Sequence, residues 1–257
     1  MPASTPIAQR DWVAGLEKGL RLIEAFNESH PRLSPSTAAR RTGLTRTAAR
    51  RYLLTLHQLG YLDSDGKLFW LTPRVLRLGW SYFDSAKVPR TVQPFLQHIS
   101  RELGGVTVSF GVLDEDELMF VARNASGSFQ SLGFMLGARV PANLASAGIV
   151  LLACKSPEAV EIWLAKQKFL AYTPMSMVKP DAVRAVIDQA RRDGYVVLEQ
   201  QMERDRRGIA VPIQSRNGEV VGAISVSLAV GDETSNQAVL RVLPLLRQAQ
   251  SSLLTLL

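Results

Sequence analysis

The chain is 257 residues long and 46% hydrophobic, which is enough to bury the cores of one or two domains. Its single cysteine excludes an internal disulfide framework, and no stretch approaches the roughly 18 uninterrupted apolar residues of a membrane span, so we expect a soluble, cytoplasmic protein with no membrane partner. The formal charge of +7 favours a polyanionic partner, and residues 1–85 carry most of this excess, with 12 Lys plus Arg against 7 Asp plus Glu.

The first two helices are predicted from hydrophobic spacing and capping residues. Residues 1–10 look like a disordered arm, and an amphipathic helix is expected over residues 12–27. The apolar residues at helical spacing in it are Val13, Leu16, Leu20 and Ile23. The next helix should begin at Ser34 or Pro35, because serine is a favoured N-cap and proline suits the first helical position. It should end at Gly43, since glycine readily adopts the left-handed conformation that terminates helices.

A third helix follows after one tight turn. Thr45 should cap a helix that runs from Arg46 to about Leu59, and Gly60 should end it. Two short helices across a tight turn are typical of a helix-turn-helix. Residues 29–62 also hold six arginines and no aspartate or glutamate, which makes the local field strongly positive.

DNA contacts are expected mainly at the start of this third helix, because side chains there reach base edges when such a helix lies in the major groove. The predicted DNA-binding residues of the two helices are Arg40, Arg41, Thr45, Arg46, Thr47, Arg50 and Arg51. Arg46, Thr47 and Arg50 should read bases, since the arginine fork suits guanine, and the other three arginines should contact phosphates. The alternative is that these arginines form an ordinary solvated helical face.

A wing is predicted next. Apolar or aromatic runs at residues 61–63 and 67–71 flank the sequence Ser64-Asp65-Gly66, and Asp-Gly between such runs is a strong hairpin signal. Lys67 on this wing should lie near the DNA backbone or the minor groove. We therefore interpret residues 1–71 as a winged helix-turn-helix domain that binds double-stranded DNA.

A further helix is expected from Thr72 to Ser85, with Thr72 as its cap and Pro73 in its first turn. The segment KVPR, residues 87–90, then breaks the pattern. We place the domain boundary here and interpret residues 72–90 as a linker helix that can transmit rotation between two domains. The other interpretation is a helix that only ends the winged domain.

Residues 91–257 predict an α+β domain with one antiparallel sheet and helices packed around it. Strands are expected at residues 106–113, 118–123, 129–135, 139–140, 208–214 and 220–228. Helices are expected at residues 92–103, 146–153, 157–167, 181–192 and 235–257. Pro244 should kink the last helix or mark a late start.

A family resemblance covers almost the whole chain. It rests on LEKGLRLIEAF at 16–26, RTGLTRTAARRYLLTLHQLGYL at 41–62, LTPRVLRLGWSY at 71–82, and a C-terminal signature at 194–227. These segments resemble the IclR family of bacterial transcription regulators, and TRTAARRYLLTL and LTPRVLRLG resemble its branch for protocatechuate and 4-hydroxybenzoate catabolism. The resemblance implies a GAF-like or PAS-like sensor for a small aromatic acid effector, and a homodimer or a dimer of dimers.

The resemblance also implies which residues line the effector pocket. The segment GARVPANLASAGIVLLA at 137–153 is similar to the family stretch in which a loop enters the pocket helix, and amides at a helix N-terminus attract anions. The pocket residues that it implies are Asn143, Ala145, Ser146, Gly148, Glu203, Ser225 and Ser227. We add Arg123 as a carboxylate partner at a strand end. The alternatives are an exposed strand-end arginine and, for the two strand serines, a solvent-facing edge.

The chain departs from the family pattern at a few pocket positions. Gly208 stands where relatives usually have serine or cysteine, Asp205 and Arg206 replace a common Gly-Leu, and Asn143-Leu144 replaces a bulkier or hydroxyl pair. These differences affect the identity of the effector and leave the DNA-binding half unchanged.

No catalytic or cofactor motif is found, since GxSxG, GxxxxGK[ST], GxGxxG after a strand and HExxH are all absent. The three histidines are too scattered for a metal site, and Cys154 follows an apolar run that favours a buried position over a nucleophile. We predict a ligand-responsive regulator, with no catalytic residues, metal or cofactor, that binds pseudo-palindromic DNA as a two-fold dimer. An enzyme domain for an aromatic compound tethered to a DNA-binding head, and a winged helix that binds protein, remain as alternatives.

Overall fold

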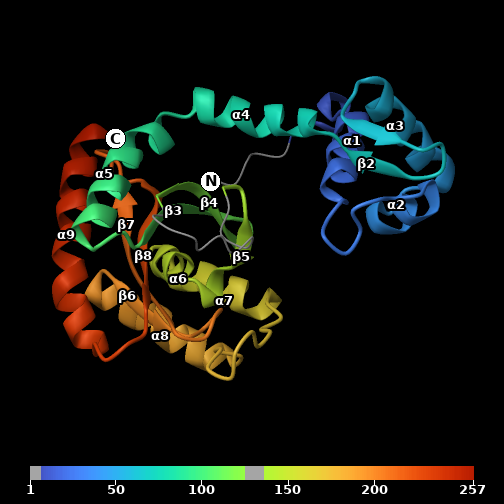
Figure 1. Cartoon of the computed structure of the whole chain (residues 1–257). Coiled ribbons are helices and arrows are strands. Elements are labelled where there is room, and N and C mark those ends of the chain that lie inside the picture. The colour runs from blue at the N-terminus through green and yellow to red at the C-terminus, as the bar shows by residue number, and fades with distance from the viewer. Residues whose placement is uncertain (1–6, 125–135) are drawn as a thin grey trace. The chain divides into compact units, whose positions relative to one another are not determined.

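The structure is a computed structural model that describes residues 7–124 and 136–257 (Figure 1). It divides into two compact units, Met1–Ser85 and Ala86–Leu257. The described part of the first unit contains a two-stranded sheet and that of the second a six-stranded sheet, each packed with helices.

The N-terminal unit folds as a winged helix-turn-helix followed by one further helix. Its elements in chain order are a 3-10 turn at Gln9–Asp11, α1 (Ala14–Glu24), α2 (Pro35–Thr42), α3 (Arg46–Gln58), β1 (Leu62–Ser64), β2 (Phe69–Leu71), a 3-10 turn at Pro73–Val75 and α4 (Leu76–Ser85). β1 and β2 pair antiparallel, with Leu62 opposite Leu71. The winged helix-turn-helix predicted from the sequence is confirmed.

The ends of α2 and α3 form through the predicted capping residues. The Thr37 amide donates to Ser34 Oγ at 3.2 Å, and the Ala48 amide donates to Thr45 Oγ1, also at 3.2 Å. Gly43, which follows α2, has a left-handed φ of 71°, a conformation that glycine adopts at little cost. Because these signals act within one helical turn, the start of each helix agrees with the prediction.

Helix α1 buries a different face from the one predicted. Leu22 is fully buried, whereas Val13, Leu16 and Leu20 are 67%, 64% and 46% exposed. Ile23 is partly buried against the core of the unit. Most of the apolar stripe of α1 therefore remains on the surface of the N-terminal unit.

The ends of α1 also differ from the prediction. The helix stops at Glu24, and Asn27 and His30 then close a turn by exchanging backbone hydrogen bonds of 3.4 and 2.9 Å. In the predicted disordered arm, residues 9–11 form the 3-10 turn, and residues 1–6 lie outside the described residues.

The C-terminal unit alternates helices with the strands of one sheet. Its elements in chain order are α5 (Lys87–Glu102), β3 (Thr107–Asp114), β4 (Glu117–Asn124), β5 (Arg139–Pro141), a 3-10 turn at Ala142–Leu144, α6 (Ser146–Ala153), α7 (Pro157–Lys166), α8 (Pro180–Asp193), β6 (Val196–Glu199), β7 (Arg206–Gln214), β8 (Val220–Ala229) and α9 (Ser235–Leu256). The strands pair antiparallel in the order β5-β4-β3-β8-β7-β6. The predicted α+β class and antiparallel sheet are confirmed.

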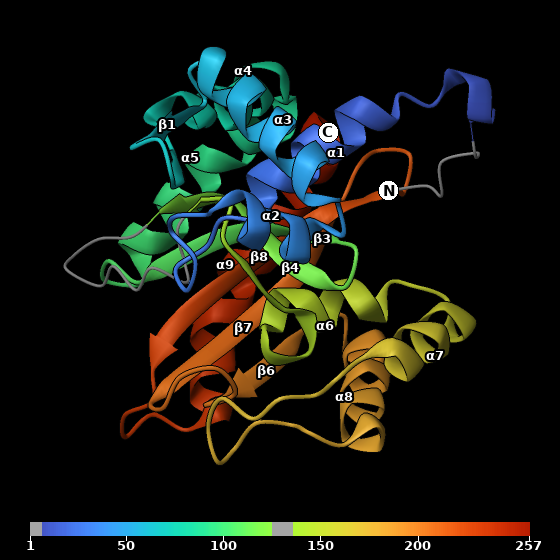
Figure 2. The same ribbon diagram turned by 90° about the vertical axis from the view of Figure 1, so that its right-hand side faces the viewer.

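Helices cover both faces of this sheet (Figures 1 and 2). On one face, α5 and α9 pack through buried side chains such as Leu96 and Leu246. On the other face, α6, α7 and α8 pack through Ile149, Trp163 and Ile187. Since successive residues of a strand point to opposite faces, each central strand contributes to both cores.

Several predicted bounds in the C-terminal unit need correction. KVPR forms the first turn of α5, and the break lies at Ala86, whose backbone is extended. Pro89 is tolerated there because first-turn amides have no intrahelical partner. Strand β6 was not predicted, and the strand expected at 129–135 lies outside the described residues. The last helix begins at Ser235, under a capping box of Thr234 and Gln237, and continues through Pro244.

Gly148 allows α6 to pack against the preceding 3-10 turn. A Cβ at this position would lie 2.2 Å from the Ala142 carbonyl oxygen, a distance that forces backbone movement. We expect Gly148→Ala to destabilise the C-terminal unit by about 1–3 kcal/mol, which lowers its Tm by roughly 2–4 °C for each kcal/mol. Differential scanning calorimetry measures this change. Gly231→Ala is the control, since a Cβ there meets nothing within 4 Å, and equal Tm values for both variants would contradict the expectation.

Candidate functional site

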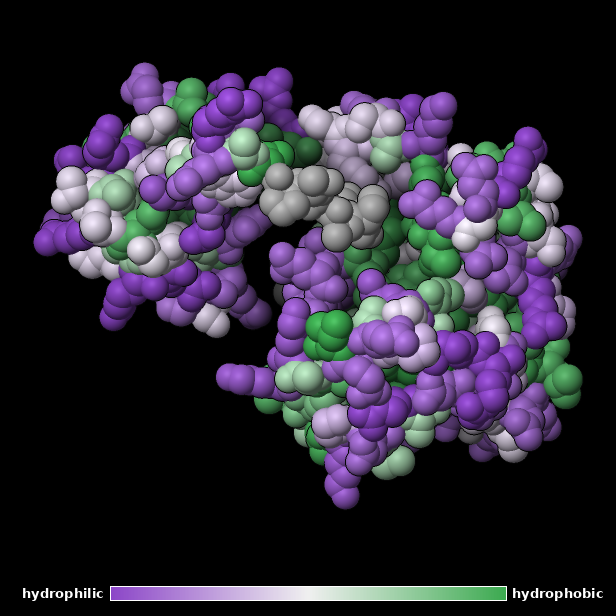
Figure 3. Space-filling model, turned by 180° about the vertical axis from the view of Figure 1, so that it is seen from behind, coloured by the Kyte–Doolittle hydropathy of each residue, from purple (hydrophilic) through white to green (hydrophobic). Residues whose placement is uncertain are grey.

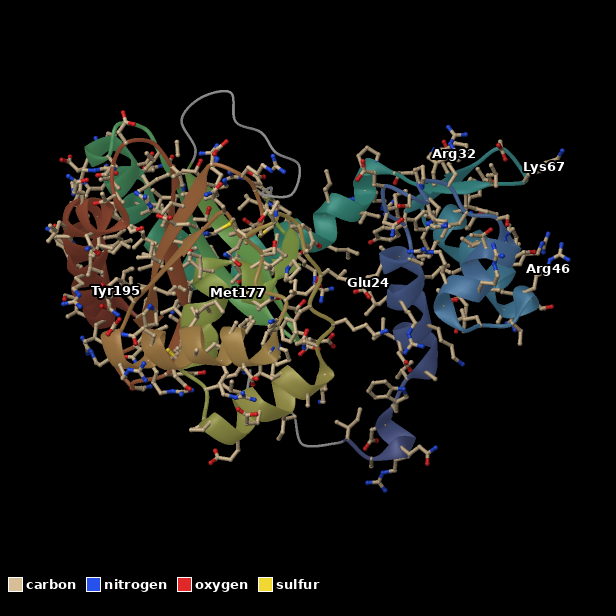
Figure 4. All side chains as sticks on the ribbon, turned by 90° about the horizontal axis from the view of Figure 1, so that it is seen from below. Glu24, Arg32, Arg46, Lys67, Met177 and Tyr195 are labelled. Atoms are coloured by element: carbon tan, nitrogen blue, oxygen red, sulfur yellow. The ribbon has the colours of Figure 1, made fainter. Side chains whose placement is uncertain are left out.

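The outward side of α3 carries the residues predicted to read bases. Ala49, Leu53 and Leu56 are buried in the core of the N-terminal unit, and this fixes which side of α3 faces solvent. The exposed polar residues of α2 and α3 are Arg40, Thr45, Arg46, Thr47, Arg50 and Arg51, among others. Figure 4 shows Arg46 projecting away from the body of the unit. This side of α3 is therefore free to enter a groove.

The turn between β1 and β2 is ordered by Asp65. Its Oδ1 accepts from the Lys67 amide at 2.9 Å and from the Leu68 amide at 2.7 Å. These two amides hold the pKa of Asp65 below its ordinary value. Gly66 has a left-handed φ of 91°, and the Lys67 side chain projects from the tip (Figure 4). The wing thus presents one lysine on a stiff turn.

Two other arginines are held by contacts inside the N-terminal unit. Arg41, predicted to contact phosphate, donates from Nε to the Ala25 carbonyl at 2.7 Å, and its Nη1 lies 3.1 Å from His30 Nδ1. Its guanidinium therefore ties α2 to the end of α1. Arg32 lies over the ring of Trp70, with Cζ 4.3 Å from the ring centroid, and helps to fix β2. Nothing in the spacing of Arg32 and Trp70 along the chain indicates this contact.

In Figure 3 the visible surface of the N-terminal unit is largely hydrophilic. Residues 29–62 of this unit contain six arginines and no aspartate or glutamate. This composition gives the segment the positive charge expected of a DNA-binding face.

A second candidate site lies in the C-terminal unit, in a cavity of about 90 Å³ between the sheet and the start of α6. One water needs roughly 10–15 Å³, so the cavity has room for a small molecule. Its apolar lining includes Leu118, Phe120, Leu144, Leu198 and Met202. The polar part of the lining is Thr107, Ser109, Arg123, Ser146, Gln200, Gln201, Glu203, Arg206, Arg207, Ser225 and Ser227.

Polar side chains of the central strands form the floor of this cavity. Arg123 pairs with Ser109 across β4 and β3, and Ser109 pairs with Ser225 on β8. In the next row, Thr107 pairs with Ser227. Because residues two apart on a strand share a face, both rows face α6. β8 lies between β3 and β7, so a solvent-facing edge for the two serines is excluded.

Six of the eight residues predicted for the pocket line this cavity, namely Arg123, Ala145, Ser146, Glu203, Ser225 and Ser227. The other two, Asn143 and Gly148, are not among the residues that line it. Asn143 donates from Nδ2 to the Met177 carbonyl at 3.4 Å, and Gly148 packs against Ala142.

The charged groups of the cavity lie close to one another. Glu203 Oε2 is 3.9 Å from Arg206 Nε, and the Glu203 carboxylate also acts on Arg123. Burial lowers the pKa of Arg123 from its ordinary value, and Glu203 partly opposes this shift. The sequence indicates Arg206 only as a departure from the family pattern, and the structure places it in the lining of the cavity.

Gly208 shapes the cavity opposite α6. A Cβ at this position would lie 2.7 Å from Ser146 Oγ. Gly208 also pairs with Ser227 across β7 and β8. The glycine therefore leaves room in front of the Ser146 hydroxyl, which a serine or cysteine at this position would fill.

A loop outside the cavity holds the wall formed by residues 200–203. Thr173 Oγ1 donates to the Gln200 carbonyl, and Ser176 Oγ donates to the Gln201 carbonyl at 2.6 Å. The Gln201 side chain accepts from the Met177 amide at 2.8 Å and donates to the Met175 carbonyl at 2.8 Å. Figure 4 marks Met177 on this loop. Sequence reasoning missed this network, since its partners lie more than twenty residues apart.

Over residues 7–124 and 136–257, no group of three or more His, Cys, Asp or Glu side chains is placed to hold a metal ion. Among the helices of the same residues, none has the length and apolar character needed to cross a membrane.

Comparison with known proteins assigns both units. The family description "IclR helix-turn-helix domain" matches residues 15–66, and "Bacterial transcriptional regulator IclR C-terminal" matches residues 80–253. The p-hydroxybenzoate hydroxylase transcriptional activator of Acinetobacter baylyi is 37% identical over 98% of this chain and 94% of its own length. The Pca regulon regulatory protein of Pseudomonas putida is 35% identical over 95% of this chain and 84% of its own.

Solved structures agree with these sequence matches. An IclR homolog from Microbacterium hydrocarbonoxydans, crystallised in complex with 4-hydroxybenzoate, is similar at a TM-score of 0.72 and 25% identity. The similarity covers 93% of this chain and 98% of that one.

Proposed function

The chain belongs to the IclR family of bacterial transcription regulators, and on that premise we propose that it controls genes for aromatic-acid catabolism in response to a small aromatic carboxylate. The observation that carries this proposal is the cavity against α6, which joins apolar walls to an arginine and two rows of hydroxyl groups. Such a lining suits a flat ring with one carboxylate and ring hydroxyls. The homolog bound to 4-hydroxybenzoate supports this ligand class, and the relatives named as the p-hydroxybenzoate hydroxylase transcriptional activator and the Pca regulon regulatory protein support the control of aromatic catabolism.

In this proposal α3 enters the major groove of a pseudo-palindromic operator in the bacterial cytoplasm. Arg46, Thr47 and Arg50 contact base edges from the first two turns of the helix, while Arg40 and Arg51 contact phosphates. Thr45 keeps the helix start in place through its cap. Lys67 contacts the backbone or the minor groove from the wing. Arg41 connects α2 to the residue that follows α1, since its Nε donates to the Ala25 carbonyl.

The effector carboxylate is proposed to pair with Arg123. This side chain is partly buried in the cavity, where an ion pair is stronger than in water. The start of α6 lies on the same cavity, and its N-cap residue, Ala145, provides no side-chain cap, so its amides add to the anionic preference. Leu118 and Phe120 would contact the ring, and the serine rows would bind ring hydroxyls.

The proposed assembly is a homodimer, or a dimer of dimers, that pairs through the N-terminal unit. Leu76 and Trp80 share one face of α4 and are 74% and 65% exposed. Trp12 and Leu16 add exposed apolar surface on and near α1. Exposed apolar side chains that share a helix face favour an interaction site, and two-fold pairing suits two half-sites of an operator.

The proposed signal passes through α4, which ends the DNA-binding unit. In this proposal residues 72–90, which form a 3-10 turn, α4 and the first turn of α5, link an N-terminal domain at residues 1–71 to an effector domain at residues 91–257. A ligand changes DNA binding only if it has different affinities for two arrangements of the domains. The effector would thus select one arrangement of the DNA-binding heads.

The proposal can be tested by fluorescence anisotropy with DNA from upstream of this gene and its neighbouring operon, against a scrambled duplex. We expect a preference of about 1,000-fold or more for the operator, and a change of about 5–150-fold when 4-hydroxybenzoate or protocatechuate is added. Equal, salt-sensitive binding to both duplexes would argue against an operator. An operator affinity, DNA bend and transcription level that no aromatic acid alters would argue against the effector.

A further inference from the structure

We propose that Gly208 makes the cavity selective for aromatic acids with a ring hydroxyl. The glycine leaves a notch, bounded by Ser146, Gly208 and Ser227, in which that ring hydroxyl binds. This inference rests on the proposed function, because it concerns the ligand of the same cavity. It goes beyond that function by placing the hydroxyl at one subsite and by assigning the choice between hydroxylated and unsubstituted acids to one residue.

Helix α6 approaches the sheet closely at Gly208. It packs on β7 and β8 (Figure 2), and its first residue is Ser146. A Cβ on residue 208 would lie 2.7 Å from Ser146 Oγ and 3.2 Å from Ser146 Cβ. Both residues line the cavity. The cavity therefore reaches the Ser146 hydroxyl because residue 208 has no side chain.

Ser227 lies on the other side of this gap. It pairs with Gly208 across β8 and β7. Directly opposed residues of an antiparallel pair project from the same face, with Cβ positions about 4.5–5.5 Å apart. On its other side Ser227 pairs with Thr107 of β3. The row of hydroxyl side chains on β3 and β8 thus continues on β7 into a position without a side chain, next to Ser146.

The two hydroxyls of the notch are available to a ligand. Ser146 is only 7% exposed. Within residues 7–124 and 136–257, neither Ser146 Oγ nor Ser227 Oγ takes part in a hydrogen bond. A buried hydroxyl without a partner costs free energy, which a bonded ligand group recovers. A ring hydroxyl can donate to one serine and accept from the other, so one group satisfies both side chains.

The size of the notch favours a hydroxyl over the other groups of an aromatic acid. The gap corresponds to the space of one missing Cβ group, which suits a single oxygen better than the two oxygens of a carboxylate. An unsubstituted ring presents only a C–H group there and leaves both serines unpaired. A site built to bond a hydroxyl discriminates against an analogue that lacks it. Benzoate should therefore bind more weakly than a hydroxybenzoate.

Calorimetric titration of the full chain with benzoate, 3-hydroxybenzoate and 4-hydroxybenzoate tests this selectivity. The hydroxyl preference is the Kd of benzoate divided by the Kd of the tighter-binding hydroxybenzoate, and wild type should show about tenfold or more. Ser146→Ala and Ser227→Ala should each lower the preference by about 2–10-fold, because each removes one hydrogen bond. The benzoate Kd should stay the same. Ser251→Ala, at an exposed serine of α9 outside the cavity lining, is the control.

Gly208→Ala fills the notch and should lower the hydroxyl preference by about tenfold or more. Gly231→Ala is its control, since a Cβ there meets nothing within 4 Å. Adding Ser146→Ala to Gly208→Ala should cause little further loss, because both substitutions remove the same contact and contacting residues are not additive. The Tm of each variant reports its folding, and the two serine variants carry the test if Gly208→Ala does not fold.

The outcomes separate this inference from the proposed function. If wild type binds benzoate as tightly as the hydroxybenzoates, or if both serine variants keep the wild-type preference, the hydroxyl subsite is wrong and the proposed function stands. If Ser146→Ala weakens benzoate as much as the hydroxybenzoates, the carboxylate occupies the notch, and the inference is again overturned. If wild type binds none of the three acids, the inference and the proposed effector fail together.

Discussion

Replacing Arg123 with methionine should weaken 4-hydroxybenzoate binding by about 30-fold or more. Truncating one partner of a buried charge pair costs about 2–5 kcal/mol, and tenfold in affinity corresponds to about 1.4 kcal/mol. The lower end applies because Arg123 is only partly buried. Methionine has similar length and fills the space, so the change removes the charge and the hydrogen-bond donors without opening a large void.

Calorimetric titration of the full chain measures this loss. Arg139→Met is the matched control, because Arg139 forms ion pairs with Asp114 and Glu117 at the surface and does not line the cavity. The control should bind the acid as wild type does. Equal affinities for Arg123→Met and wild type would show that the carboxylate binds elsewhere, for example at the start of α6.

Replacing Arg46 with alanine should weaken operator binding by about 5–150-fold, because a lost arginine–base contact costs about 1–3 kcal/mol. The effect should be selective, with little change for a scrambled duplex. Alanine is the best helix former, and the Thr45 cap bonds to the Ala48 amide and not to Arg46. The variant should therefore keep α3 intact, which circular dichroism checks.

Lys67→Ala provides the contrast for Arg46→Ala. A phosphate contact from the wing carries no sequence information, so this variant should weaken binding to both duplexes alike. It should also reduce the slope of log affinity against log salt by about 1. If Arg46→Ala behaves like Lys67→Ala, Arg46 contacts phosphate and the assignment of base reading at the start of α3 is wrong.

The fold of the DNA-binding unit was predictable because its signals act over a few residues. Ser34 and Thr45 each cap a helix by bonding to an amide three residues ahead, and Asp65 orders the wing within its own turn. The face that α1 buries depends on how α2 and α3 pack against it. The apolar spacing of α1 therefore predicted a helix correctly. The prediction that Leu16 and its apolar neighbours face the core was wrong, because these side chains are exposed.

Most of the predicted residues that line the cavity, such as Ser146, Glu203 and Ser225, came from the family resemblance, and strand alternation by itself gives only the shared face of Ser225 and Ser227. Asn143 and Gly148 lie close to Ser146 in sequence, yet the 3-10 turn and α6 direct them toward Met177 and Ala142. The ion pair between Glu203 and Arg206 depends on a loop bracketed by two left-handed residues. No sequence spacing indicates left-handed backbone at a glutamine or an aspartate.

The proposed regulator depends on the coupling between effector binding and operator binding. This coupling is tested most directly by measuring the affinity of 4-hydroxybenzoate for the chain alone and for the chain bound to its operator. Thermodynamic linkage requires that the operator change acid affinity by the same factor by which the acid changes operator affinity. We expect equal factors of about 5–150-fold in the two titrations. The same acid affinity with and without operator would contradict this coupling, even if both ligands bind tightly.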